Sequence, residues 1–181
     1  RLTDRRGRVA SAECRVADFT PHLEFSIPRP RRRLWSPEDP FLYGLRIELL
    51  DERNRVLDAV DSYAGLRSIT LDGRAVKLNG KPVFQRLVLD QGFYADGIYT
   101  APTDAALRRD ITLSQAAGFN GARLHQKGCD VRVLYWADRL GYLVWGEFAD
   151  WGCSKEGPAW DHQNMSGAYI TQWLEELERD Y

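Results

Sequence analysis

Cysteine is scarce in this chain of 181 residues, and its spacing excludes two kinds of site. The three cysteines, Cys14, Cys129 and Cys153, are widely separated along the sequence. An odd number of widely spaced cysteines provides neither a disulfide framework nor the close pairs that bind structural zinc. We therefore expect reduced thiols, which favour a cytoplasmic protein.

The chain also lacks an excess of charge and a long apolar run. Its formal net charge is −1 at pH 7, so nothing in the charge indicates nucleic acid or an anionic membrane as a partner. No apolar run reaches the length that spans a bilayer. The first ten residues, RLTDRRGRVA, contain no apolar core of a signal peptide. The 44% hydrophobic content is ordinary for a globular protein and allows one large domain or two small ones.

Short strands are the predicted content of residues 1–68. Four runs alternate roughly between apolar and polar residues, and turn signals rich in proline and aspartate separate them. The runs are GRVASAECRV, HLEFSIPR, YGLRIELLD and NRVLDAVDSYAG. This spacing is typical of a β-sandwich. Four strands are too few to close one, so we expect the start of the domain to lie outside this chain.

Residues 69–181 change to an alternation of strands and helices. Asn79-Gly80 lies between VKL and KPVF, which is the signal of a type I′ hairpin. The elements that follow are predicted as strands near 83–90, 119–125 and 142–147, and as helices near 103–117, 130–140 and 167–179. Strands that are joined by helices run parallel, so we expect a parallel sheet here.

Capping residues mark two of these helices. Thr103 and Asp130 can each accept a hydrogen bond from the first turn of the helix that follows, and Gly141 is placed to end the second helix.

Ionisable residues end each predicted parallel strand. Asp90 closes the first strand, Arg123 and His125 close the second, and Glu147 closes the third. In α/β barrels and in open parallel sheets, the carboxyl edge of the strands is where chemistry is placed. We therefore expect these four side chains to lie together at one edge of the sheet.

Four segments of the sequence, in matching order from about residue 34 onward, resemble glycoside hydrolase family 2. They are LWSPEDPFLYGLRIELLD, LNGKPVFQRLVLDQG, LRRDITLSQAAGFNGARLHQ and YWADRLGYLVWGE. That family contains β-galactosidases, β-glucuronidases and β-mannosidases. The resemblance implies that residues 1–68 are the later strands of an immunoglobulin-like β-sandwich. It implies that residues 69–181 are the opening hairpin and first three β/α units of a catalytic TIM (β/α)8 barrel.

The resemblance also implies that the residues at the strand ends bind substrate. Asp90 matches a sugar-contacting position that is often His in the family. Arg123 matches the Arg of an Arg-x-Ser-His motif that contacts the sugar. The motif is one residue shorter here, so either His125 or Gln126 takes the place of its His.

Glu147 matches the Glu of an Asp-Glu pair in the family, with Gly146 in place of the Asp. In some members that Glu helps to hold a divalent cation, which the resemblance allows for the parent of this chain. Trp151 follows in the next loop and is a candidate for stacking on a sugar, although loop packing is an equal alternative.

Both catalytic glutamates of the family are expected beyond Tyr181. The acid/base lies in an Asn-Glu motif at the end of the fourth barrel strand, and the nucleophile lies at the end of the seventh. No Asn-Glu dipeptide occurs in the sequence. The resemblance therefore implies a carbohydrate partner and no catalytic glutamate or resident cofactor in this chain, and it leaves a homo-oligomer open.

Three functions remain as alternatives. The first is a fragment of a retaining β-glycosidase, acting on β-galactosides before β-glucuronides or β-mannosides. The second is a non-catalytic carbohydrate-binding or scaffold module. The third, a barrel hydrolase that holds a metal with His125 and Glu147, requires more ligands than this stretch offers. For single residues, Arg123 can simply pair with a carboxylate, and His125 can be a structural histidine.

Overall fold

The chain forms two compact units, Arg1–Val83 and Phe84–Tyr181. The computed structural model describes residues 1–15, 21–125, 129–147, 153–154, 157–158, 171 and 174–175. The hairpin that the sequence assigned to the second domain makes its contacts within the first unit. The expected domain boundary after residue 68 stays a prediction.

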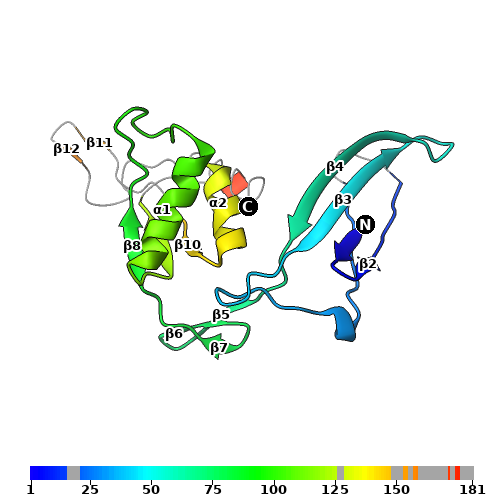
Figure 1. Ribbon diagram of the computed structural model, residues 1–181, viewed down its shortest axis with the longest axis horizontal. Coiled ribbons are helices and arrows are strands. Elements are labelled where there is room, and N and C mark those ends of the chain that lie inside the picture. Colours follow the sequence, from blue (N-terminus) through cyan, green and yellow to red (C-terminus); the bar gives the residue numbers. More distant parts are fainter. Residues whose placement is uncertain are drawn as a thin grey trace. The chain divides into compact units, whose positions relative to one another are not determined.

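An antiparallel sheet in the order β2-β1-β3-β4 forms the framework of the N-terminal unit. Its long strands β3 and β4 form a hairpin that pairs from Tyr43↔Ala64 to Leu50↔Val56 (Figure 1). Its core includes Leu2 and Tyr43 from the sheet and Trp35 from the segment before β3. The strands are β1 (Leu2–Asp4), β2 (Gly7–Ala10), β3 (Tyr43–Leu50) and β4 (Val56–Ala64).

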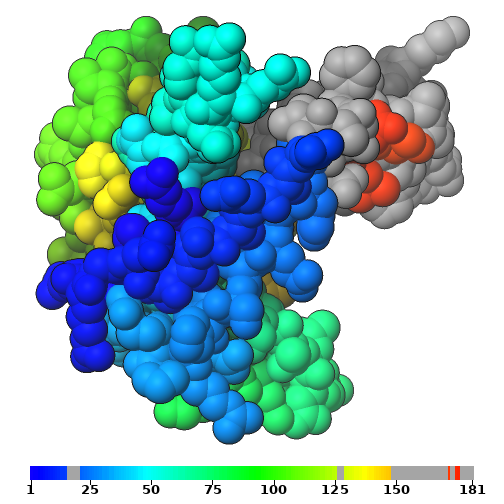
Figure 2. Space-filling model, turned by 90° about the vertical axis from the view of Figure 1, so that its right-hand side faces the viewer, coloured from blue at the N-terminus to red at the C-terminus, as the bar shows by residue number. Residues whose placement is uncertain are grey.

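A short 3-10 helix, η1 (Arg29–Arg31), is attached to this sheet by side-chain contacts. Arg31 pairs with Asp4 at the end of β1. Arg33 N–H donates to the Tyr43 hydroxyl (2.7 Å), which donates to the Arg31 carbonyl (2.7 Å). Figure 2 shows the dark-blue N-terminal residues lying against this lighter-blue segment.

The strand predicted over HLEFSIPR, residues 22–29, is wrong. Residues 21–28 belong to none of the described strands, and η1 begins at Arg29. Pro28 and Pro30 lack backbone N–H groups, so this stretch offers fewer donors to a sheet. The residues do alternate between apolar and polar side chains, but alternation does not ensure that another strand lies beside them to accept their hydrogen bonds.

A small antiparallel sheet in the order β5-β6-β7 completes the N-terminal unit. Asn79 and Gly80 have φ values of 53° and 76°, which confirms the predicted left-handed turn between β6 and β7. The Asn79 amide donates to the Trp35 carbonyl (2.9 Å) and accepts from Ser68 N–H (3.1 Å). The strands are β5 (Ile69–Asp72), β6 (Ala75–Leu78) and β7 (Lys81–Pro82).

A parallel sheet in the order β10-β9-β8 is the centre of the C-terminal unit, as the sequence predicted. Helices α1 and α2 lie side by side along it (Figure 1). Ile111 of α1 and Ala137 of α2 join Ala122, Leu124 and Tyr142 in one buried cluster. The elements are β8 (Leu87–Asp90), α1 (Asp104–Ala116), β9 (Gly121–Leu124), α2 (Val131–Leu140) and β10 (Leu143–Trp145).

The predicted helix caps are confirmed. The Thr103 hydroxyl accepts from Ala106 N–H (3.1 Å), and the Asp130 carboxylate accepts from Arg132 N–H (3.0 Å). Gly141 ends α2 with a φ of 71°, a left-handed conformation that glycine adopts without steric cost.

The remaining described residues lie in short pieces near the C-terminus. β11 (Cys153–Ser154) pairs antiparallel with β12 (Gly157–Pro158). Of the helix predicted near 167–179, residues 171 and 174–175 are described and are helical, and the rest lies outside the described residues. Cys14 is exposed and Cys129 is half-buried. No helix among the described residues is both long and apolar enough to cross a membrane.

Candidate functional site

An ion pair joins the carboxyl edges of β9 and β10. Arg123, the third residue of β9, donates through Nε to the Glu147 carboxylate, two residues past the end of β10. The Glu147 side chain is 18% exposed and that of Arg123 is 54% exposed. The carboxylate is therefore fixed at a partly buried position, while much of the guanidinium faces outward. Arg123 and Glu147 are two of the four residues that the sequence placed at this edge.

The same face of the sheet presents apolar side chains around Arg123. Parallel pairing aligns Arg123 with Leu89 of β8 and with Trp145 of β10. Aligned residues of neighbouring strands point to the same face, and both of these partners are about half exposed. The face away from the helices thus carries a charged pair with apolar neighbours.

Asp90 ends β8 at the same edge but is directed differently. It aligns with Leu124, one position beyond Arg123, and adjacent residues of a strand point to opposite faces. Its carboxylate accepts from Gly92 N–H (2.7 Å), which closes a tight turn after the strand. The structure therefore places Asp90 at the expected edge without bringing its side chain to the Arg123–Glu147 pair.

His125 follows β9 and contacts Asp90 at the end of β8. Its backbone N–H donates to the Asp90 carbonyl (2.8 Å), and its ring Nδ1 lies 3.4 Å from the Gln91 side-chain nitrogen. The backbone bond fixes the position of His125 next to β8. Gln91 is a polar neighbour that sequence reasoning did not single out.

Two predicted substrate-binding residues, Gln126 and Trp151, lie outside the described residues. Within the described part of the chain, no group of three or more His, Cys, Asp or Glu residues could hold a metal ion. The Glu147 carboxylate is paired with Arg123 instead. The described residues alone therefore do not fit the divalent cation that the resemblance allowed.

A tyrosine that the sequence did not single out anchors the loop after β8. Tyr94 donates from its hydroxyl to the Asp110 carboxylate of α1 (2.8 Å), and its backbone bridges to Ile98. Burial, followed by this bond to Asp110, raises the pKa of Tyr94 well above its ordinary value. The phenol therefore stays protonated at neutral pH and serves as a donor. Spacing alone gave no signal for this contact, because the partners are 16 residues apart on different elements.

A second phenol, which is buried, lies under the same helix. The hydroxyls of Tyr142 and Ser114 are 2.6 Å apart, and burial raises the pKa of Tyr142. Both phenols line a cavity of about 400 Å³ between α1 and the sheet, which Asp90 also borders. The cavity on this side of the sheet thus has polar groups at its rim and apolar side chains inside.

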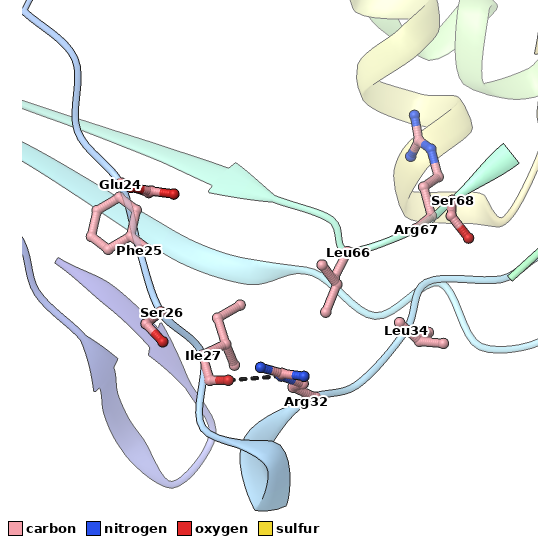
Figure 3. Close-up of a pocket in the computed structure, with 9 residues that line it drawn as sticks. All are labelled: Glu24, Phe25, Ser26, Ile27, Arg32, Leu34, Leu66, Arg67 and Ser68. Atoms are coloured by element: carbon pink, nitrogen blue, oxygen red, sulfur yellow. Dashed lines mark hydrogen bonds between the residues drawn. The ribbon is translucent and has the colours of Figure 1, made fainter.

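The N-terminal unit contains a larger, open hollow of about 640 Å³. Figure 3 shows Ile27 and Leu66 pointing into it from opposite sides, with Arg32 bonded to the Ile27 carbonyl (2.8 Å). The Arg67 guanidinium lies over the Trp35 ring, 4.9 Å from its centre. Sequence reasoning did not find this hollow, because it forms beside the segment that was wrongly assigned as a strand.

Comparison with known proteins places these features in a family. The family described as "Glycosyl hydrolases family 2" matches residues 2–67. A putative β-glucuronidase of Formosa agariphila is 34% identical over 149 residues, which cover 81% of this chain and 18% of that protein. The chain belongs to glycosyl hydrolase family 2. The prediction made from the four sequence segments is thereby confirmed.

Other known proteins are similar over most of the chain. A β-galactosidase of Vibrio cholerae is 30% identical over 155 residues, which cover 81% of this chain and 14% of that protein. The structure of a β-glucuronidase from Ruminococcus gnavus, in complex with a C6-substituted uronic isofagomine, superposes with a TM-score of 0.79. It covers 99% of this chain and 29% of that one at 22% identity, so it shows a shared fold. The chain spans less than a fifth of the length of the two curated relatives.

Proposed function

We propose that this chain is part of a retaining β-glycosidase that hydrolyses terminal β-linked sugars. β-Galactosides are the first candidate substrates, and β-glucuronides and β-mannosides are the others. The observation that carries the proposal is the Arg123–Glu147 pair at the carboxyl edge of a parallel sheet, in a chain of family 2. At that edge a barrel enzyme binds its substrate.

The proposed architecture is part of an immunoglobulin-like sandwich over residues 1–68, followed by the first three β/α units of a TIM barrel. The antiparallel sheet β2-β1-β3-β4 supports the first part, since one half of a sandwich has this pairing. The order β8-α1-β9-α2-β10 supports the second. Leu89 and Trp145 are about half exposed on the face away from the helices, as expected for residues that a closed barrel would cover.

In the proposed enzyme, Arg123 and Glu147 bind and orient rather than react. The guanidinium is a fixed donor for sugar hydroxyls, and Glu147 holds its orientation. Retaining hydrolysis needs two carboxyl groups about 5–5.5 Å apart, one to protonate the leaving oxygen and one to attack the anomeric carbon. Glu147 is committed to Arg123 and cannot fill both roles, so the proposal places both catalytic glutamates beyond Tyr181.

The test compares this chain with a longer polypeptide that carries the rest of the barrel. Both are assayed with chromogenic aryl β-galactoside, β-glucuronide and β-mannoside. We expect no turnover from the chain alone and turnover of one substrate class by the longer protein. In the longer protein, Arg123→Ala should lower kcat/KM by about 100-fold, because misplacing a substrate by about 1 Å has an effect of that size.

Two results would contradict the proposal. Turnover by the chain alone that disappears in Glu147→Gln would mean that Glu147 is catalytic. No turnover of any β-glycoside by the longer protein would remove the glycosidase assignment. A matched control is Arg108→Ala on α1, which removes the same charge from a helix and should leave kcat/KM unchanged.

A non-catalytic carbohydrate-binding module is the second candidate, and the hollow in the N-terminal unit is the observation that favours it. Its volume of about 640 Å³ can accommodate a small saccharide. Ser26 and Ser68 offer hydroxyls at its lining, beside the apolar Leu66. Saccharide binding that is lost in Leu66→Asp, with no turnover in the longer protein, would support this candidate over the enzyme.

A further inference from the structure

Two large aromatic side chains project from the loop that follows β8. Phe93 is 66% exposed and Tyr99 is 68% exposed. Their rings are in contact, edge to face, with centres 6.4 Å apart and planes at 84°. We call these two residues the aromatic pair. Exposed aromatic rings cost hydration free energy, so a pair of them in one loop indicates a surface that contacts something else.

The loop holds the aromatic pair in a fixed position. Tyr94 N–H donates to the Ile98 carbonyl (2.7 Å), and Ile98 N–H donates back to the Tyr94 carbonyl (2.8 Å). The Tyr94 hydroxyl binds Asp110 of α1. The backbone between Phe93 and Tyr99 is therefore tied to itself and to a helix, which limits the entropy lost when the rings bind a ligand.

Backbone conformation in this loop is unusual for its residues. Ile98 has a φ of 58°, in the left-handed region that a β-branched residue rarely adopts. A side chain at Gly97 would lie 2.1 Å from the Thr100 carbonyl oxygen, so glycine is required there. Such strain is retained where surrounding structure enforces it, often at ligand-binding loops. Here it turns the chain so that Tyr99 returns to Phe93.

The loop also begins at the candidate site. Asp90 ends β8, and Gln91 contacts the His125 ring at the end of β9. The polar edge formed by Arg123, Glu147 and His125 suits the hydroxyl-rich terminal sugar. The aromatic pair follows in the loop that begins at this edge, where Phe93 also borders the cavity between α1 and the sheet, and it suits a ring with an apolar face.

We infer that the aromatic pair binds the leaving-group side of the substrate, by stacking on the ring that follows the terminal sugar. This inference rests on the proposed glycosidase function and extends it to a second subsite. The shared chemistry of the ligand is a six-membered ring with an apolar face, either the C–H face of a second sugar or an aryl group.

The test uses the full-length glycosidase that carries this chain, with three substrates that share the terminal sugar. One is a β-linked disaccharide, one is an aryl β-glycoside, and one is the glycosyl fluoride, whose leaving group has no ring. Phe93→Ala and Tyr99→Ala should each lower kcat/KM about three- to tenfold for the ring-bearing substrates, as expected for one aromatic contact. The glycosyl fluoride should be hydrolysed at the unchanged rate. A loss confined to the disaccharide, or to the aryl glycoside, identifies which ring is bound.

Two further variants separate stacking from folding. Phe93→Tyr keeps the ring and should retain wild-type kinetics with all three substrates. Phe84→Ala removes a phenylalanine that is 80% exposed before the opposite end of β8, and it should also leave the kinetics unchanged. Equal losses for the fluoride and the disaccharide would overturn the inference, as would unchanged kinetics in both alanine variants.

Direct binding separates the inference from the function on which it rests. In a nuclear magnetic resonance titration of the full-length protein with a non-hydrolysable, sulfur-linked analogue of the disaccharide, the ring resonances of Phe93 and Tyr99 should shift, and a terminal monosaccharide should not shift them. Full-length protein without glycosidase turnover would contradict the proposed function. Absence of the ring shifts would contradict the second subsite, whether or not turnover is seen.

Discussion

Tyr43 is the largest fully buried side chain among the described residues, and its hydroxyl joins two backbone groups. It accepts from Arg33 N–H and donates to the Arg31 carbonyl. Tyr43→Phe keeps the ring but leaves both partners without this bond. We expect the free energy of unfolding of the N-terminal unit to fall by about 0.5–1.5 kcal/mol, the net contribution of a typical hydrogen bond, because Arg31 is half-buried and Arg33 is exposed. Urea denaturation measures the change, and Leu57→Ala at an exposed position of β4 should produce a much smaller one.

Asp4 makes the stability of the same unit dependent on acid. The hydrogen bond from Arg31 holds the pKa of Asp4 below its ordinary value of 3.8. A carboxyl group with a lowered folded-state pKa stabilises the protein above its unfolded pKa, and this stability is lost as the pH falls through the folded value. We expect the free energy of unfolding to decrease as the pH is lowered from about 4. In Asp4→Asn this part of the pH dependence should be absent, and an identical acid profile in both proteins would contradict the assignment.

At the scale of elements, close packing around one glycine sets the spacing of the parallel sheet. A Cβ on Gly121 of the central strand β9 would lie 2.4 Å from the Leu143 carbonyl oxygen and 2.6 Å from the Leu87 side chain. Gly121→Ala must therefore separate β9 from its neighbours. We expect a loss of about 1–3 kcal/mol in the stability of the C-terminal unit. Gly146→Ala is the matched control, because a Cβ there meets no atom within 4 Å, and equal losses in the two variants would contradict this explanation.

Local signals in the sequence predicted most of the elements correctly. Thr103, Asp130 and Gly141 act within one helical turn of their own positions, so their roles follow from residue type and spacing. The strand at 22–29 depended on a partner far away in the sequence, and alternation carries no information about that partner. Pro28 and Pro30 were the features of the sequence that argued against a strand there.

The sequence predicted at which edge of the sheet the candidate site residues lie, but it did not predict which of their side chains contact one another. Strand ends located Asp90, Arg123, His125 and Glu147 because parallel strands finish at one edge. The direction of each side chain depends on register, and a shift of one residue turns Asp90 away from Arg123. The Tyr94 contact depends on how α1 packs, which no short sequence pattern records.

At the scale of the whole molecule, exposed apolar surface on one sheet favours self-association. Ile47 of β3 is directly opposite Val60 of β4, and both are about half exposed on the same face. We expect the isolated chain to associate as its concentration rises, which analytical ultracentrifugation measures. The double change Ile47→Lys and Val60→Lys should shift the chain toward the monomer.

Val56→Lys provides the control for this association. Val56 is about as exposed as Val60, but it aligns with Leu50 of β3, which points to the opposite face from Ile47. If Val56→Lys abolishes association as completely as the double change does, general charge repulsion is the cause and the face formed by Ile47 and Val60 is not the interface.

Ile98 has a consequence for how this chain would respond to selection. Its left-handed backbone is a conformation that asparagine or glycine adopts at lower cost, so a screen for heat resistance would enrich Ile98→Gly or Ile98→Asn. Glycine would also give the loop more freedom to move Tyr99 away from Phe93. Selection for thermal tolerance would therefore favour glycine or asparagine at position 98, whereas selection for turnover of large substrates would disfavour glycine. Asparagine is the residue that meets both requirements.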